Sequence, residues 1–283
     1  MKRLISAILV MLLLTLGFCG CTGNAAEKTT VAATTWPVFQ FTQAVCEGSD
    51  LAVTQIVTGQ ISCLHDYTLT VRQMQAIESA ELVITSGCDL EEFMAAALAN
   101  SGDVIECCEG VPLLEGEEGL DPHIWMDPDN AAAMVRNIAA ALTERYPENA
   151  ELFAENAEYY CARLGEIKTY GEETLRELSC RELVTFHDGF AYFAQAFDLH
   201  ILAALEEEDG ATASAETVEE IIGLVRENSL PAIFTETYGS DSAASVIASE
   251  TGVRIFTLSM AMSGEDYFTA MRHNIDTIRE ALG

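Results

Sequence analysis

PENAELFAENAEYYCARLGEIKTYGEETLREL, residues 147–178, is the stretch that decides the fold. Apolar residues recur in it at mostly three- and four-residue spacing: Phe153, Ala157, Tyr160, Leu164, Ile167, Leu175 and Leu178. This spacing predicts one apolar face of a long α-helix, and Pro147 is well placed in its first turn. A helix of this length would extend over roughly 45–50 Å, so we expect a rigid backbone and not a flexible hinge.

Short β-rich segments alternate with helical segments on both sides of this stretch. Before it we expect strands at 29–35, 51–57, 81–86 and 103–107, with helices at 36–46, 70–80 and 90–99. After it we expect strands at 182–186, 199–205, 231–235 and 254–258, and helices at 189–197, 215–227, 241–250 and 265–281. Such alternation is typical of βαβ units in parallel sheets. The predicted fold class is therefore α/β with two lobes, at 22–146 and 179–283, each a mostly parallel sheet flanked by helices and joined by the helix at 147–178.

The first residues have the form of an export signal. Lys2 and Arg3 precede an apolar run, 4–18, which is too short for a comfortable membrane span. The run ends near Cys21, which follows a glycine, as in a bacterial lipobox. Cys19 fits this pattern less well because a phenylalanine precedes it. We therefore predict a lipoprotein signal peptide at 1–21 with lipidation at Cys21. The alternative is an uncleaved N-terminal anchor, and both interpretations place the body of the protein outside the cytoplasmic membrane.

The charge of the chain is strongly negative. Asp and Glu number 45 against 14 Lys and Arg, a formal net charge of −31. Such a surface repels nucleic acid and attracts cations diffusely, so we expect no nucleic-acid partner. Hydrophobic residues make up 49% of the chain, which indicates a globular protein and not an acidic disordered one.

The nine cysteines do not form a recognisable disulfide framework. Without the leader and Cys21 an odd number is left, the spacing is irregular, and no CxxC occurs. We therefore interpret most of them as small buried apolar residues or free thiols. Cys63, two residues before a histidine, is the one thiol that could neighbour a metal site.

Three of the five histidines occupy loop or strand-end positions: His65, His123 and His187. His187 directly follows an apolar strand, and the other two lie in connections of the first lobe. Ligands of open α/β sheets collect at the carboxyl ends of the strands, so these side chains would converge if both lobes face one cleft. His200, inside a predicted strand, and His273, in the last helix, are interpreted as structural or surface residues. The three histidines form neither an HExxH motif nor a pair three to five residues apart, so the fold must bring them together to make a metal site.

Three motifs carry a family resemblance: LHDY at 64–67, DPHIWMDP at 121–128 and TFHDGFAYF at 185–193. Together they resemble the zinc and manganese solute-binding proteins of ABC importers, over essentially the whole mature chain. The resemblance implies two α/β lobes joined by one rigid helix, with the metal between them on His65, His123 and His187. It also implies an extracytoplasmic receptor, anchored to the outer face of the cytoplasmic membrane. Such a receptor serves an ABC permease and its ATPase, and we expect it to be a monomer.

The ligand types favour zinc. Three neutral imidazoles suit Zn(II), which prefers four-coordinate nitrogen and sulfur sites. Manganese prefers oxygen-rich shells. The resemblance implies that manganese receptors of this family carry a carboxylate where this chain has His187. Zn(II) is therefore the predicted substrate, with manganese or iron as alternatives within the same type of receptor.

Two departures from the family pattern concern the rest of the site. The segment 108–120 holds four glutamates but no histidine, unlike the His-rich loop of many zinc receptors. Family members usually place an aspartate ligand after the last strand, where this chain has Ser259. Water or another carboxylate would then complete the shell. Glu236 is our candidate, and the alternative is a buried hydrogen-bonding role. Asp66 and Asp188 are interpreted as supporting or helix-capping groups.

Two other classes of protein compete with the receptor. Three histidines and a water also describe a catalytic zinc site, and the position at Ser259 motivates that hypothesis. The chain has no nucleophile elbow, HExxH motif or phosphate-binding glycine loop, so we predict that it is not an enzyme. A surface adhesin with incidental metal affinity is the other alternative. The long helix predicts small rocking motions of the lobes and not wide closure.

Overall fold

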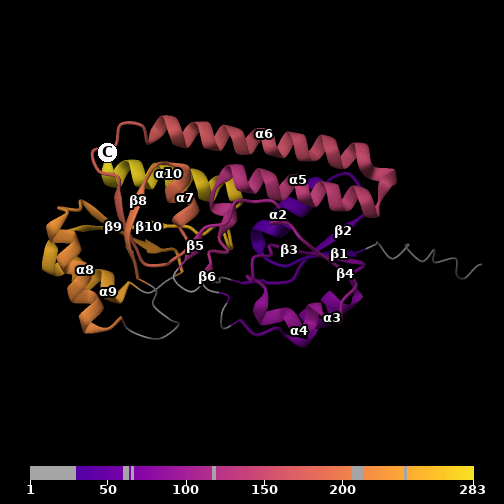
Figure 1. Ribbon diagram of the computed structural model, residues 1–283, viewed down its shortest axis with the longest axis horizontal. Helices are drawn as coiled ribbons and strands as arrows, with labels where there is room; N and C mark the ends of the chain where they lie inside the picture. Colours follow the sequence, from indigo (N-terminus) through magenta and orange to yellow (C-terminus); the bar gives the residue numbers. More distant parts are fainter. Residues whose placement is uncertain (1–29, 60–63, 65–66, 117–118, 206–212, 239–240) are drawn as a thin grey trace, which may run out of the picture.

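Two parallel sheets and one long helix organise the molecule (Figure 1). A computed structural model describes residues 30–59, 64, 67–116, 119–205, 213–238 and 241–283. The sheets lie side by side, and α6 runs along the same side of both. The predicted α/β class with a long linking helix is confirmed, while the lobe boundaries at 22–146 and 179–283 stay predictions.

The first sheet has the order β2-β1-β3-β4 and is wholly parallel. Its strands are β1 (Thr30–Ala33), β2 (Ala52–Gln55), β3 (Leu82–Thr85) and β4 (Asp103–Glu106). The accompanying helices are α2 (Trp36–Val45), α3 (Val71–Ser79) and the short α4 (Ala95–Leu98), which follows a 3-10 turn. Strand β3 is buried along its whole length because it lies inside the sheet, with strands on both sides.

The second sheet repeats this topology in the order β10-β9-β7-β8. Its strands are β7 (Glu182–Thr185), β8 (His200–Ala204), β9 (Ala232–Glu236) and β10 (Arg254–Leu258), with helices α7 (Ala191–Ala196), α8 (Ala215–Glu227), α9 (Ser242–Thr251) and α10 (Tyr267–Leu282). In both sheets the first and third strands in chain order are central, the second flanks the first, and the fourth flanks the third. The two sheets are therefore built to one plan.

A small antiparallel hairpin, β5 (Glu115–Gly116) and β6 (Gly119–Leu120), was not predicted from the sequence. Two residues per strand are too few to show the alternation that marks a strand. The hairpin leads directly into the segment that carries His123.

The long helix is shorter than its apolar pattern predicts. Helix α6 (Ala150–Thr174) has 25 residues, about 38 Å, and a 3-10 turn at Pro147–Asn149 precedes it. A methyl group at Gly171 would overlap the ring of Phe197, so the glycine admits the end of α7 against the last turn of α6. The buried Leu175 belongs to the apolar stripe but lies just beyond the helix.

One continuous apolar core joins the two halves. It extends from Val31 in the first strand to Leu282 at the end of α10 and includes the buried face of α6. Helix α6 packs against α2 and α5 (Pro128–Arg145) as well as against α10 of the second half. Smaller clusters lie within each half. Because separating the halves would expose the shared core to water, the packing favours small relative motions.

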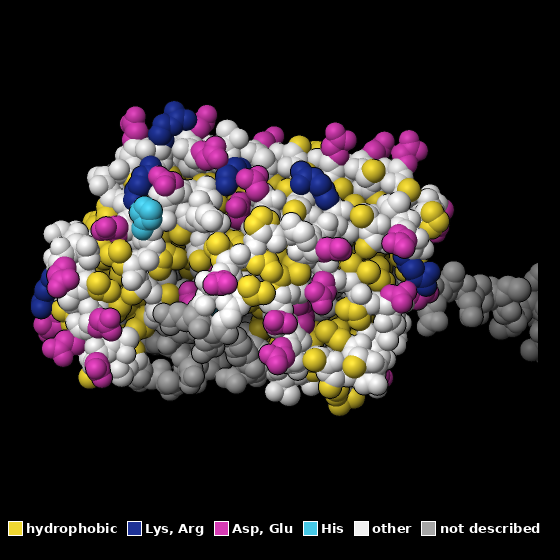
Figure 2. Space-filling view, in the orientation of Figure 1, with side chains coloured by type: hydrophobic (Ala, Val, Ile, Leu, Met, Phe, Trp, Pro, Cys, Tyr) yellow, Lys and Arg dark blue, Asp and Glu magenta, His cyan; other side chains and the backbone are white. Residues whose placement is uncertain are grey.

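The surface carries the acidic excess of the composition. Figure 2 shows Asp and Glu side chains along the edge occupied by α6 and over the rest of this face, with fewer Lys and Arg. Among the described helices, none combines the length and apolarity needed to cross a bilayer. The predicted signal peptide and Cys21 lie outside the described residues.

Candidate metal centre

Two of the three predicted histidine ligands meet between the halves of the chain. Nε2 of His123 lies 3.4 Å from Nε2 of His187, and the ring planes are inclined by 84°. His187 follows β7 and is buried, while His123 begins the 3-10 turn Ile124–Met126 and is mostly buried. His123 and His187 are 64 positions apart in the chain, and the fold brings their Nε2 atoms together.

The separation of these nitrogens fits a shared metal ion. Two nitrogen ligands at 2.0–2.1 Å from a tetrahedral zinc lie about 3.3–3.4 Å apart. A direct hydrogen bond between two imidazoles would be somewhat shorter. The His123–His187 pair therefore has the spacing that one zinc ion would require of two of its ligands.

Asp121 holds the His123 ring by hydrogen bonds to its side chain and backbone. Its Oδ1 lies 2.8 Å from Nδ1 of His123 and also accepts the His123 backbone N–H at 2.9 Å. A carboxylate beside Nδ1 favours the tautomer with the proton there, which leaves the lone pair of Nε2 free for a metal. The sequence interpretation missed this role. The sequence feature that could have indicated it is the aspartate two residues before His123.

Buried hydrogen bonds fix the segment 121–126 to the second half of the molecule. The Tyr192 hydroxyl on α7 donates to the Asp121 carbonyl at 2.9 Å. The Trp125 indole donates to the Met260 carbonyl at 2.9 Å, and the Tyr267 hydroxyl donates to the Trp125 carbonyl at 2.7 Å. Because all three bonds cross between segments far apart in sequence, the position of His123 is set by the second half of the chain.

The turn after β7 leaves room for the His187 ring. A Cβ at Gly189 would lie 2.7 Å from Cδ2 and 3.0 Å from Nε2 of His187, closer than side chains normally approach. Glycine at this position therefore lets the imidazole lie over the backbone. The exposed Asp188 is not the N-cap of α7, which is Phe190, so the helix-capping interpretation of Asp188 is wrong for this helix.

Glu236 and Ser259 lie at the same edge of the second sheet as His187. Thr185 pairs with Phe234, and the Phe186 N–H donates to the Phe234 carbonyl, so the register continues toward His187 beside Glu236. Glu236 ends β9, is buried, and pairs with the last residue of β10, directly before Ser259. A histidine, a carboxylate and a hydroxyl therefore follow or end three adjacent strands at one edge of the sheet.

Comparison with known proteins identifies the family of this site and fold. Residues 31–281 match the family described as zinc-uptake complex component A, periplasmic. The chain belongs to this family. It is 28% identical over 231 residues to the manganese-binding lipoprotein MntA of Halalkalibacterium halodurans, covering 77% of each chain. It is 27% identical over 279 residues to the iron-binding protein YfeA of Yersinia pestis, covering 92% of this chain and 88% of that one.

A solved structure has the same architecture. The Zn(II)-bound ZnuA-like domain of Streptococcus pneumoniae AdcA matches with a TM-score of 0.79 and 25% identity, over 90% of this chain and 99% of that one. Membership of the zinc-uptake family confirms the prediction of a solute-binding receptor for an ABC importer, which is not an enzyme.

Hydrogen bonds fix the turn that contains Ser259. Its hydroxyl accepts the Ala261 N–H at 3.2 Å, and Ala261 has a left-handed φ of 54°. The buried Asn274 side chain accepts the Ser259 N–H at 2.8 Å and donates to the Ser259 carbonyl at 2.7 Å. The Ser259 oxygen is therefore already used to hold its own turn.

The remaining predicted residues lie elsewhere or outside the described chain. His65, Asp66 and Cys63 are not among the described residues. Within the part of the chain that the structure describes, no three His, Cys, Asp or Glu side chains are grouped closely enough to hold a metal, so the structure brings His123 and His187 together but does not group Glu236 with them. His200 begins β8 and is exposed, and exposed His273 on α10 has Nε2 3.1 Å from the Thr257 carbonyl oxygen.

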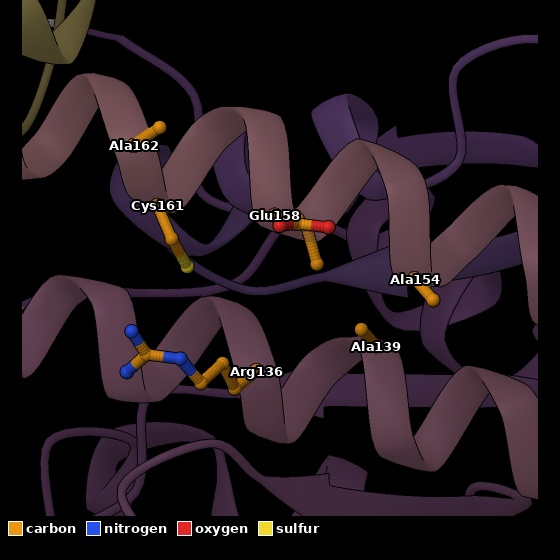
Figure 3. A pocket seen from close by; sticks show the side chains of 7 residues that line it. Arg136, Ala139, Ala154, Glu158, Cys161 and Ala162 are labelled. Carbon is orange, nitrogen blue, oxygen red and sulfur yellow. The ribbon is translucent and has the colours of Figure 1, made fainter.

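A groove between α5 and α6 is separate from these histidines (Figure 3). It has a volume of about 520 Å³ and is lined by Arg136, Ala139, Ala154, Ala157, Glu158, Cys161 and Ala162. Figure 3 shows Arg136 on α5 and Cys161 on α6 pointing toward each other across it. Its lining includes none of the predicted metal ligands.

Proposed function

We propose that this receptor captures one divalent transition-metal ion, Zn(II) by preference, on His65, His123, His187 and Glu236. The 3.4 Å separation of the two Nε2 atoms is the observation that carries the proposal. Asp121 supports it, because a hydrogen bond at Nδ1 orients His123 and makes its Nε2 a better ligand. His65 would supply the third imidazole from the first lobe.

Glu236 is proposed as the fourth ligand, in preference to Ser259. It is a buried carboxylate at the sheet edge beside His187, where a negative charge would offset that of the metal. The Ser259 hydroxyl is bonded within its own turn and is a neutral, weak ligand for zinc. A metal-bound water is the alternative to Glu236.

The receptor would act at the outer face of the cytoplasmic membrane, held there by a lipid on Cys21. As a monomer it would present the loaded cleft to an ABC permease driven by its ATPase. The shared core and α6 support release by small rocking of the lobes.

Manganese or iron is the second candidate substrate. The names of the MntA and YfeA relatives favour it, and Glu236 would supply the oxygen ligand that harder metals prefer. Two imidazoles facing each other at this spacing favour zinc.

The proposal is tested by titrating the purified, metal-free mature protein with zinc in a calorimeter. We expect one zinc per chain, bound more tightly than micromolar, and a melting temperature that rises in excess zinc by mass action. Competition with manganese on the same protein then decides between the metals. Affinity no tighter than micromolar for either metal would refute the receptor function.

Two substitutions test the fourth ligand. If Glu236 binds the metal, Glu236→Gln weakens zinc binding while Ser259→Asp changes it little. If water fills the position, Ser259→Asp strengthens binding because a carboxylate replaces a weak ligand, and Glu236→Gln has a small effect.

A further inference from the structure

Two cysteines come together at the carboxyl edge of the first sheet. Beyond the ends of β3 and β4, the Cys107 N–H donates to the Thr85 carbonyl at 3.0 Å and the Cys108 N–H to the Ser86 carbonyl at 3.1 Å. The parallel pairing therefore continues past both strands and places Cys108 beside Gly87. Cys88 is the next residue after Gly87, in the turn that follows β3.

An unusual turn brings the Cys88 side chain to Cys108. Gly87, Cys88 and Asp89 have left-handed φ values of 85°, 56° and 62°. The buried Glu91 carboxylate holds this turn by accepting the Ser86 N–H at 2.8 Å and the Gly87 N–H at 3.0 Å. Two consecutive non-glycine residues in this conformation carry a conformational cost, which the anchored turn offsets.

The position of the Cys108 thiol depends on Gly87. A Cβ at Gly87 would lie 2.5 Å from the Cys108 Sγ, which is far inside normal contact distance. The Cys108 thiol therefore lies against the backbone of Gly87, the residue directly before Cys88. Neighbouring strands are about 4.8 Å apart, and a disulfide bridges Cα atoms about 4.4–6.8 Å apart. Cys108 lies opposite Gly87, one residue from Cys88, so a bridge from Cys108 to Cys88 requires the Cα separation that disulfides span.

The two thiols are chemically unequal. Interaction with the Cys108 side chain raises the pKa of Cys88, and the same interaction lowers the pKa of Cys108. Burial raises the pKa of Cys88 further. Cys108 is partly exposed, whereas its neighbour Cys107 is fully buried with Sγ 3.8 Å from the Ser86 carbonyl oxygen. Cys108 is therefore the accessible nucleophile of the pair, and Cys88 the resolving thiol.

We propose that Cys88 and Cys108 form a thiol–disulfide exchange site, whose partner is a small-molecule or protein disulfide. The Cys108 thiolate attacks one sulfur of the partner, which forms a mixed disulfide and releases the other sulfur as a thiolate. The Cys88 sulfur then attacks Cys108 Sγ, closes the Cys88–Cys108 bond and releases the second thiolate. The partner is reduced to two thiols, which take the protons of the two cysteines.

A metal site is not the better explanation of the same cluster. The Glu106 carboxylate also approaches Gly87, with Oε2 3.1 Å from the position of a Cβ there. In the residues that the structure describes, however, no three such groups are arranged to hold a metal ion. Two neighbouring thiols suffice for disulfide exchange, which needs no third ligand.

The test uses the reduced, purified mature protein in glutathione buffers of increasing oxidised fraction, followed by alkylation of the remaining thiols. No Lys or Arg occurs between Arg72 and Arg136, so cleavage after glutamate is required. It yields LVITSGCDLE (82–91) and CCE (107–109) as separate peptides. We expect these two peptides to become disulfide-linked as the buffer becomes more oxidising, and to separate again in reductant.

Matched variants identify the sulfurs involved. Cys107→Ser and Cys161→Ser should keep the link, and Cys108→Ser should abolish it. In Cys88→Ser, Cys108 should collect a stable glutathione adduct, because no resolving thiol remains. The proposal is overturned if the native protein forms no link under conditions where the urea-unfolded chain does. It is also overturned if the link survives in Cys108→Ser, or if Cys88 joins a cysteine outside 107–109.

Discussion

The carboxyl edges of the two sheets differ in chemistry although the sheets share one topology. In the second sheet, His187, Glu236 and Ser259 lie at the ends of neighbouring strands. In the first sheet, the matching edge carries thiols after β4 and a turn held by the buried Glu91. The order of strands therefore determines where a site can form, and the few residues after each strand determine which chemistry it supports.

The two edges also differ in how their polar groups are satisfied. Glu91 accepts hydrogen bonds from Thr34, Ser86 and Gly87, all within its own half. His123, by contrast, is oriented through a segment that Tyr192, Met260 and Tyr267 bind from the other half. The thiol edge is thus a local structure, whereas the proposed metal centre would depend on the packing of the two halves against each other.

Removing a ligand should have the largest effect. We expect His187→Ala to weaken zinc binding by more than about 100-fold, because even loss of a supporting hydrogen bond costs about 10–100-fold. Calorimetric titration measures the change. His273→Ala on α10 is the matched control and should bind zinc as the native protein does. Equal affinities of the two variants would remove His187 from the site.

Removing the support of a ligand should have a smaller effect. We expect Asp121→Asn to weaken zinc binding by about 10–100-fold, because the amide no longer fixes the His123 tautomer as a carboxylate does. The exposed Asp50→Asn removes the same charge elsewhere and should leave affinity unchanged. An equal loss in both variants would mean that the general negative field, and not the Asp121–His123 bond, controls binding.

Removing the Tyr192 hydroxyl tests whether the position of His123 depends on contacts from the second half of the chain. Tyr192→Phe leaves the Asp121 carbonyl and the Leu114 N–H without that partner, so we expect the free energy of unfolding to fall by about 1–3 kcal/mol. Zinc affinity should fall less than in Asp121→Asn. Tyr159→Phe on the exposed face of α6 should change stability by less than about 0.5 kcal/mol. Denaturant titration of both variants measures the difference.

The smallest predicted effect concerns pH at the first edge. Burial raises the pKa of the Glu91 carboxyl above its ordinary value of 4.5, so the folded chain binds this proton more tightly than the unfolded chain. The contribution of Glu91 to stability is therefore greatest below that value and declines as pH rises through the raised pKa. We expect the free energy of unfolding of the native protein, relative to Glu91→Gln, to fall over this range. Parallel stability curves for the two proteins would contradict the assignment.

Much of the fold follows from local patterns in the sequence. The three- and four-residue spacing in 147–178 and the alternation of short apolar strands with helices depend only on nearby residues, so both are visible without a structure. The hairpin β5–β6 was missed because it is too short to show a pattern. The end of α6 at Thr174 was missed because the apolar spacing continues past it to the buried Leu175, which lies beyond the helix.

The sequence by itself determined the class of the fold, the position of His123 and His187 at strand or helix ends, and the resemblance to metal receptors. Only the tertiary structure decided that their Nε2 atoms lie 3.4 Å apart, that Asp121 orients His123, and that the Ser259 hydroxyl holds a turn. It also placed Cys108 beside Gly87, the neighbour of Cys88, although these residues are distant in the sequence. The reason is the same in each case: strand register and the packing of the two halves bring these atoms together, and neither is encoded in the spacing of residues along the chain.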